Sequence, residues 1–334
     1  MFKYLLLGVL SAAALTAAVP ASAPVYGLVL HGGAGVIRPE TLPPGQEAQY
    51  RAKLQEALDA GYAVLEGGGS SVEAVIAVIT ILEDSPLFNA GKGAVFNADG
   101  ICELDASIMD GRNLAAGAIA GVQHVRNPIL LARAVMEKSE HVMLTGAGAE
   151  AFAKQQGFEL VPNEYFHTEL RRQQLEKVRK RETTPAKASA AILRPTDEKH
   201  GTVGCVALDR AGNLAAGTST GGMTNKKFGR VGDSPIIGAG TYASNATCAI
   251  SATGWGEYFI RLGVARDIAA QMEYRGTPLA EAAAATIAKV GQLGGDGGVI
   301  CLDRAGNIAM PFNTVGMYRA FRLSNGETAV KIGR

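Results

Sequence analysis

The feature that most restricts the fold of this chain is an abrupt change in character at Gly201–Thr202. Residues 182–201 are rich in Thr, Pro, Ala and Lys and lack apolar periodicity, which is typical of an exposed, flexible linker. Immediately afterwards, Val203–Leu208 is a short apolar run, which predicts a buried strand. The fold must therefore join a linker directly to a core strand, and this junction is a place where the chain could be opened without unravelling its core.

Cutting the Gly201–Thr202 bond would change the chemistry of Thr202. A threonine hydroxyl in mid-chain is a poor nucleophile, because nothing beside it accepts its proton. A free α-amine titrates near pH ~7.7 and can act as the base for the hydroxyl of the same residue. On this dipeptide alone an ordinary threonine opening a strand is the better interpretation, and only the downstream residues reverse it.

The first 23 residues are typical of an export signal and are excluded from the fold. Lys3 supplies a positive charge, Tyr4–Ala18 is apolar, and Val19–Ala23 offers small residues for cleavage after Ala21 or Ala23. The apolar run is too short and too rich in alanine for a membrane span. We expect export to a periplasm or the medium, and no membrane attachment after the signal is removed.

Composition narrows the class of protein further. The formal net charge of the 334 residues is +1, so there is no basic excess and a nucleic-acid partner is not expected. The chain is 47% hydrophobic and 19% charged, which suits a globular protein with a sizeable core. The cysteines are far apart without metal-binding spacing, which favours buried free thiols over disulfides. They are Cys102, Cys205, Cys248 and Cys301.

Repeats and periodicity predict stacked layers of helices and strands. Gly204–Ala215 and Gly298–Ala309 each contain an apolar run, an Asp-Arg-Ala-Gly-Asn turn and a second apolar run, which predicts two β-hairpins in one sheet. Helices are expected at 46–65, 71–82 (with Ser71 as N-cap), 257–274 (with Gly263 as a candidate break) and 278–290. Because helices are grouped between strand regions, the pattern predicts an α+β fold and not a strict βαβ alternation.

Two motifs after the first hairpin carry groups suited to an amino-acid substrate. In an antiparallel hairpin, Thr220 would return close to Thr202, where its hydroxyl could hydrogen-bond the nucleophile. Further on, Arg230 suits a carboxylate through bidentate hydrogen bonds, and Asp233 suits an ammonium group. Together they would hold a zwitterionic amino-acid head, although a self-satisfied Arg–Asp turn explains the motif equally well.

Two other segments offer an oxyanion site and a cation site. The Thr253 hydroxyl and the Gly254 N–H are donors at a strand-to-helix junction, where they could stabilise an oxyanion. This signal is weak alone, because any such junction offers similar groups. The loop 82–93 has Pro and Gly between apolar anchors and could surround a hard cation with backbone carbonyls; a structural loop over the core is the alternative.

The run 200–261 closely resembles the plant-type L-asparaginases, also called isoaspartyl peptidases, which are Thr-dependent N-terminal-nucleophile hydrolases. The resemblance extends over nearly all of the mature chain and rests on ordered, highly specific motifs. These are His31–Gly35, Pro86–Gly91, Leu104–Ala106, Gly201–Gly204, Thr218–Lys226 and Gly229–Pro235.

The resemblance implies a four-layer αββα sandwich and a precursor that cuts itself before Thr202. The products would be an α subunit of residues 24–201 and a β subunit of residues 202–334, which stay together as one domain. Such pairs usually associate further, so an (αβ)2 assembly is implied. The activity implied is hydrolysis of β-aspartyl dipeptides and of the L-asparagine side-chain amide, releasing L-aspartate.

The resemblance also implies a role for each site residue. Those roles are nucleophile (Thr202), its hydroxyl partner (Thr220), support of the nucleophile (Asn89), oxyanion donors (Thr253, Gly254), substrate loop (Gly256), and ligands of the substrate α-carboxylate (Arg230) and α-amine (Asp233). No cofactor is implied for catalysis. A structural sodium ion is implied, bound by the backbone carbonyls of Leu82, Glu83, Ser85, Phe88, Ala90 and Lys92.

Two departures and two alternatives accompany this interpretation. Trp255 stands where a small residue is common, beside the oxyanion donors, and His200 replaces a variable residue before the cut. A glycosylasparaginase, which cleaves N-glycan–Asn links, shares the same logic, but Gly201 and the run Met223–Lys226 favour the isoaspartyl branch. An exported amino-acid-binding protein would use Arg230 and Asp233 without turnover and would remain one uncut chain.

Overall fold

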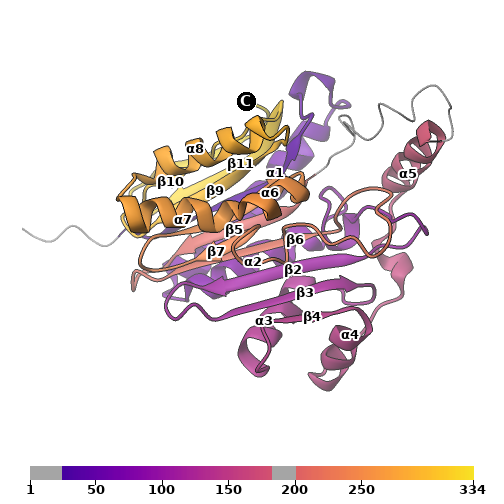
Figure 1. Cartoon of the computed structure of the whole chain (residues 1–334), viewed down its shortest axis with the longest axis horizontal. Helices are drawn as coiled ribbons and strands as arrows, with labels where there is room; N and C mark the ends of the chain where they lie inside the picture. Colours follow the sequence, from indigo (N-terminus) through magenta and orange to yellow (C-terminus); the bar gives the residue numbers. More distant parts are fainter. Residues whose placement is uncertain (1–24, 183–200) are drawn as a thin grey trace, which may run out of the picture.

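The computed structural model describes residues 25–182 and 201–334. The predicted export signal and nearly all of the predicted linker lie outside these residues. Two β-sheets lie face to face, and helices cover the outer face of each sheet (Figure 1). The predicted αββα sandwich is therefore confirmed.

The larger sheet has eight strands in the order β12-β11-β1-β5-β6-β2-β3-β4. Neighbouring strands are antiparallel except β3 and β4, which are parallel. Its strands are β1 (Gly27–Gly35), β2 (Leu104–Asp110), β3 (Ala116–Val122), β4 (Met143–Thr145), β5 (Val203–Leu208), β6 (Leu214–Thr220), β11 (Gly316–Leu323) and β12 (Thr328–Lys331). The strand that follows the linker, β5, is thus central and is buried along its whole length.

The smaller sheet has the order β10-β9-β8-β7. Its strands are β7 (Thr241–Ala243), β8 (Cys248–Gly254), β9 (Gly297–Asp303) and β10 (Ile308–Ala309). The two repeated hairpins therefore belong to different sheets, so the prediction of one shared sheet was wrong. The reason is that the Asp-Arg-Ala-Gly-Asn turn is stabilised locally: Asp209 and Asp303 each accept hydrogen bonds from N–H groups two and four residues later. Such a turn determines the shape of a hairpin, but it does not determine which sheet the hairpin joins.

Helices form the two outer layers. Those on the larger sheet are α1 (Gln46–Glu66), α2 (Ser71–Glu83), α3 (Pro128–Lys138) and α4 (Gly146–Gln155). Those over the smaller sheet are α6 (Gly256–Leu262), α7 (Val264–Arg275) and α8 (Leu279–Gln292). Helix α5 (Glu169–Glu182) lies at one end of the molecule, and short 3-10 turns occur at Pro39–Thr41, Gly91–Gly93 and Asn163–Phe166 (Figure 1).

The start of α2 differs by one residue from the prediction. Ser70, not Ser71, is the N-cap, because its hydroxyl accepts a hydrogen bond from the Glu73 N–H while the Glu73 carboxylate accepts one from the Ser70 N–H. This reciprocal capping box satisfies two helix-end donors at once.

Three apolar layers hold the sandwich together, and β1 contributes to two of them. Leu28 and Leu30 face the helices α1 and α2, whereas Val29 faces the smaller sheet. A third cluster, which includes Ile250 and Ile268, lies between the smaller sheet and its helices. Both faces of the central strands are therefore dry, and any polar group between the sheets needs a hydrogen-bond partner there.

The contact between α3 and β3 allows a direct test of this packing. A Cβ at Gly117 would lie 2.0 Å from the Ala132 carbonyl oxygen, whereas one at Gly148, in α4, would meet nothing within 4 Å. We expect Gly117→Ala to lower the free energy of unfolding by about 1–3 kcal/mol through overpacking. Gly148→Ala should leave it unchanged or raise it by up to ~1 kcal/mol. Chemical denaturation of both variants measures the difference, and equal stabilities would contradict the packing described.

Candidate active site

Thr202 lies immediately before β5, beside the end of β6. The β5–β6 register pairs Val203 with Ser219, which brings Thr202 next to Thr220. The Thr202 hydroxyl donates to the Thr220 hydroxyl across 3.2 Å, and both residues are buried. The structure therefore brings together the two hydroxyls that the hairpin argument predicted.

Asn89 acts on the segment that follows Thr220. Its side-chain N–H donates to the Gly222 carbonyl across 2.8 Å, and its backbone carbonyl accepts from the Gly221 N–H. The Gly222 N–H in turn donates to the Thr220 hydroxyl across 3.0 Å. These contacts place Asn89 behind the hydroxyl partner rather than directly against Thr202.

A close backbone contact holds the residue before Thr202. A Cβ on Gly33 would lie 2.3 Å from the Gly201 Cα, and a Cβ on Gly201 would lie 2.1 Å from the Gly33 Cα. Gly33 also has a φ of 111°, which favours glycine. The peptide that is predicted to be cut therefore packs against the backbone of β1, and neither glycine tolerates a side chain.

The predicted oxyanion donors lie at the end of β8. The Thr253 hydroxyl accepts a hydrogen bond from the Ala34 N–H across 3.3 Å, so its own proton is still available for an oxyanion. Gly254 has a φ of 155°, and a Cβ there would lie 2.5 Å from the Gly297 Cα. Because Gly201 packs on Gly33, next to Ala34, the Thr253 hydroxyl and the Gly201–Thr202 peptide adjoin the same segment of β1.

Arg230 and Asp233 do not satisfy each other. Arg230 donates through Nε and Nη2 to both carboxylate oxygens of Glu257, each across 2.9 Å. The Asp233 carboxyl is buried, and its Oδ2 has no hydrogen-bond partner in the described part of the chain. The self-satisfied Arg–Asp turn is therefore not what the structure contains, and an orphaned acidic oxygen remains for a ligand.

Gly256 makes room for this pair. A Cβ at that position would lie 2.8 Å from Asp233 Oδ1 and 2.9 Å from Arg230 Nη2. Glu257, which holds Arg230, was missed by the sequence analysis. A weak signal existed, because Glu257 directly follows Gly256 in the predicted substrate loop, but no sequence spacing indicates which cation it meets.

The Asp233 carboxyl gives the site a testable pH dependence. Burial raises its pKa to about 7, against the opposing attraction of Arg230. Below this pKa the carboxyl is neutral and cannot pair with a substrate ammonium, so KM should rise up to ~10-fold per pH unit as the pH falls. Steady-state kinetics between about pH 5 and 8 measures this.

Asp233→Asn is the matched control for that pH profile. It should raise KM at every pH and remove the acid-side slope of KM. A KM that is independent of pH in the unmodified protein would contradict the assignment of Asp233 to the ammonium group.

His31, which had no assigned role in the sequence analysis, contacts Thr202 directly. Its Nδ1 lies 3.0 Å from the Thr202 carbonyl oxygen and its Nε2 lies 3.0 Å from the Ser251 hydroxyl. Burial lowers the pKa of His31 to about 3, so its imidazole is neutral near neutral pH. A lone polar residue within the apolar run of β1 was the signal that could have identified it.

The loop between α2 and β2 brings glycine backbone against carbonyl groups. A Cβ on Gly91 would lie 2.3 Å from the Glu83 carbonyl oxygen, and one on Gly93 would lie 2.1 Å from the Phe88 carbonyl oxygen. Only glycine therefore fits at these two positions. In residues 25–182 and 201–334 no group of three or more His, Cys, Asp or Glu side chains could hold a metal ion. The sodium site expected from the resemblance stays a prediction.

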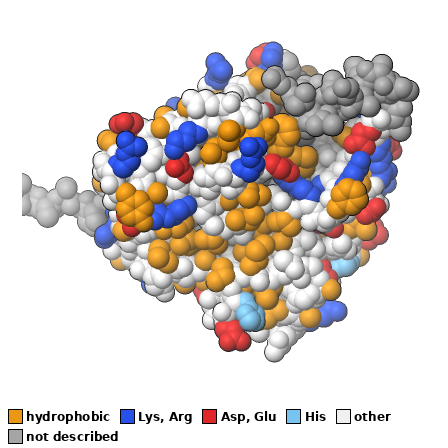
Figure 2. All heavy atoms as spheres, viewed as in Figure 1, with side chains coloured by type: hydrophobic (Ala, Val, Ile, Leu, Met, Phe, Trp, Pro, Cys, Tyr) orange, Lys and Arg blue, Asp and Glu red, His pale blue; other side chains and the backbone are white. Residues whose placement is uncertain are grey.

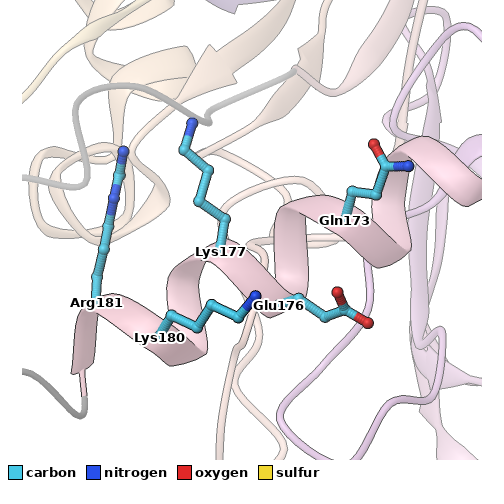
Figure 3. Close-up of a pocket in the computed structure, with 5 residues that line it drawn as sticks. All are labelled: Gln173, Glu176, Lys177, Lys180 and Arg181. Atoms are coloured by element: carbon cyan, nitrogen blue, oxygen red, sulfur yellow. The ribbon is translucent and has the colours of Figure 1, made fainter.

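A surface hollow lies apart from these residues, along α5. Its lining is polar and charged and comes from one helix, and it contains none of the predicted site residues (Figure 3). The lining residues are Gln173, Glu176, Lys177, Lys180 and Arg181.

Cysteines and membrane segments add no further site. All four cysteines are buried free thiols, as predicted. Among the helices that the structure describes, none combines the length and the apolar character that crossing a bilayer requires.

Two facing sheets between helix layers, with a threonine at the start of a central strand, define an N-terminal-nucleophile hydrolase. The family model described as asparaginase matches residues 24–332, and the chain belongs to this family.

Curated relatives cover nearly the same span. The chain is 54% identical to an isoaspartyl peptidase of Escherichia coli (strain K12), over 88% of this chain and 92% of the relative. It is 44% identical to an isoaspartyl peptidase/L-asparaginase of Xenopus laevis, over 86% and 89%. It is 40% identical to a probable isoaspartyl peptidase/L-asparaginase 2 of Arabidopsis thaliana, over 92% and 98%.

Proposed function

We propose that this protein is an autoprocessing amidohydrolase that cleaves β-aspartyl dipeptides and the side-chain amide of L-asparagine, releasing L-aspartate. The observation that carries the proposal is the pairing of the Thr202 and Thr220 hydroxyls at the start of β5. The family and the names of the curated relatives support the same reaction.

Autoprocessing uses the contact between Gly201 and β1. The Thr202 Oγ attacks the Gly201 carbonyl carbon, and a C–O bond forms. The C–N bond to Thr202 then breaks and the leaving nitrogen takes the hydroxyl proton, so that an ester and a free α-amine result. The Thr253 hydroxyl, on the adjoining segment, suits the oxyanion of this step. Water then hydrolyses the ester, which leaves a carboxylate on Gly201 and restores the Thr202 hydroxyl.

Turnover repeats this chemistry on the substrate. The α-amine of Thr202 accepts the proton of its own hydroxyl, and Oγ attacks the side-chain carbonyl of asparagine or the β-linked amide of an isoaspartyl dipeptide. The leaving ammonia or amino acid takes that proton, and an aspartyl ester of Thr202 remains. Water releases aspartate. His31 is not the base, since its Nδ1 bonds the Thr202 carbonyl and its imidazole is held neutral by burial.

Arg230 and Asp233 would recognise the part that both substrates share. The Oδ2 of Asp233 lacks a partner among the described residues, which suits the α-ammonium of aspartyl compounds. Arg230 is held along one edge of its guanidinium by Glu257 and keeps the Nη1–Nη2 edge for the α-carboxylate. An amino-acid-binding protein would also use these groups, but the buried Thr202–Thr220 pair would have no role in it.

The remaining assignments belong to the same proposal. We infer export through residues 1–23, cleavage into subunits 24–201 and 202–334, and an (αβ)2 assembly. Figure 2 shows apolar side chains gathered near the middle of one face, between the α6–α7 layer and β2, a pattern that suits association. Carbonyls of the loop 82–93 would hold a structural sodium ion, which takes no part in the reaction.

Removing the nucleophile tests the proposal. Thr202→Ala should remain one uncut chain without turnover, because both the attacking oxygen and its processing chemistry are lost. Thr202→Ser keeps a hydroxyl and an α-amine and should still yield two bands. Denaturing gels with intact mass, followed by aspartate release from L-asparagine, measure both outcomes. A Thr202→Ala protein that still splits at residue 202 would overturn the proposed function.

A further inference from the structure

A chain of buried hydrogen bonds runs between the two sheets from Thr202. It begins at the Thr202 carbonyl and passes through His31, Ser251, Thr218 and Thr241 to Ser107. Successive donor–acceptor distances are 3.0, 3.0, 2.7, 2.5 and 2.8 Å. Every side chain in it is completely buried.

Chemistry sets the direction of the first bonds. The Thr202 carbonyl can only accept, so His31 Nδ1 must carry the proton and donate it. In a neutral imidazole Nε2 is then an acceptor, and the Ser251 hydroxyl must donate to it. Thr218 and the hydroxyls beyond it satisfy the Ser251 oxygen and keep its proton directed at His31.

Gly204 allows His31 to reach across β5. A Cβ at Gly204 would lie 2.4 Å from His31 Nε2 and 2.0 Å from the Ser251 hydroxyl oxygen. Any side chain there would break the bond between them. Gly204, two residues after Thr202, therefore leaves the space that the His31 imidazole occupies.

We propose that His31, oriented by Ser251, is a positioning residue for the nucleophile. Before the cut, peptide bonds hold Thr202 on both sides. After it, Thr202 is attached only through its carbonyl, so the position of its Cα depends on the plane of the Thr202–Val203 peptide. The His31 bond to that carbonyl fixes this plane and so places the Cα from which the α-amine and Oγ extend. The inference rests on the proposed function, because it concerns the same nucleophile.

Strands from both sheets contribute to the chain. His31, Thr218 and Ser107 lie on β1, β6 and β2 of the larger sheet, and Ser251 and Thr241 lie on β8 and β7 of the smaller sheet. The Thr202 carbonyl is thus held in position relative to both sheets.

Four variants test the positioning role. His31→Leu removes both bonds, Ser251→Ala removes only the partner of His31, and His31→Asn keeps a donor near the Nδ1 position. Ile300→Val is the control. Ile300 lies on β9 and pairs with Ser251 on β8, so this variant destabilises the same layer without breaking a hydrogen bond. Rates of asparagine hydrolysis are normalised to the cut fraction, which intact mass measures.

The expected result is a loss in kcat with little change in KM. His31→Leu should lower kcat roughly 10- to 100-fold, Ser251→Ala by about 3- to 10-fold, and His31→Asn should recover most of the loss. The double variant His31→Leu/Ser251→Ala should be no worse than His31→Leu alone, because both act through one bond. Ile300→Val should keep the wild-type kcat.

Other results would overturn the inference. The inference is wrong if His31→Leu and Ser251→Ala both keep the wild-type kcat. It is also wrong if the losses in the double variant multiply, or if Ile300→Val loses as much kcat as they do. If His31→Leu does not fold, Ser251→Ala and His31→Asn decide, and unchanged kcat in Ser251→Ala contradicts the role. In each of these cases the wild-type protein is still active. Failure of the proposed function is distinguishable, because the wild-type protein itself would then remain uncut or release no aspartate.

Discussion

The structure depends on the insertion of β5 between β1 and β6, directly after the peptide that is predicted to be cut. This places Thr202 beside the interface of the two sheets, where apolar residues surround a few buried polar side chains that hydrogen bonds hold in place. The glycine-to-glycine contact of residues 33 and 201 holds the preceding peptide against β1. The same packing that makes the core thus defines the geometry of the nucleophile.

The proposed substrate-recognition residues show the opposite property, because one of their polar atoms lacks a hydrogen-bond partner. Asp233 is buried with one oxygen that has no partner in the described residues, while Arg230 is anchored along one edge by Glu257. A buried unpaired acid is costly for a folded chain, and burial accordingly raises the pKa of Asp233 to about 7. An ammonium group would supply the missing partner, which explains why this cost is compatible with function.

Local patterns predicted the layers, the hairpins and the Thr202–Thr220 contact, because hydrophobic period and antiparallel return are properties of short segments. They failed where distant segments meet. The sheet to which each hairpin belongs, the Arg230–Glu257 pair, and the bonds from His31 to Thr202 and Ser251 depend on packing between residues far apart in sequence. The family resemblance named roles for motif residues, but it did not reveal which neighbours hold them.

The central claim is that Thr202, as a chain terminus, supplies both the attacking oxygen and the proton acceptor. The most direct measurement is turnover after selective acetylation of the α-amine of the mature β subunit, with the extent of blocking read from intact mass. Activity should fall in proportion to the blocked fraction and vanish when blocking is complete. Undiminished aspartate release from fully blocked protein would contradict the account.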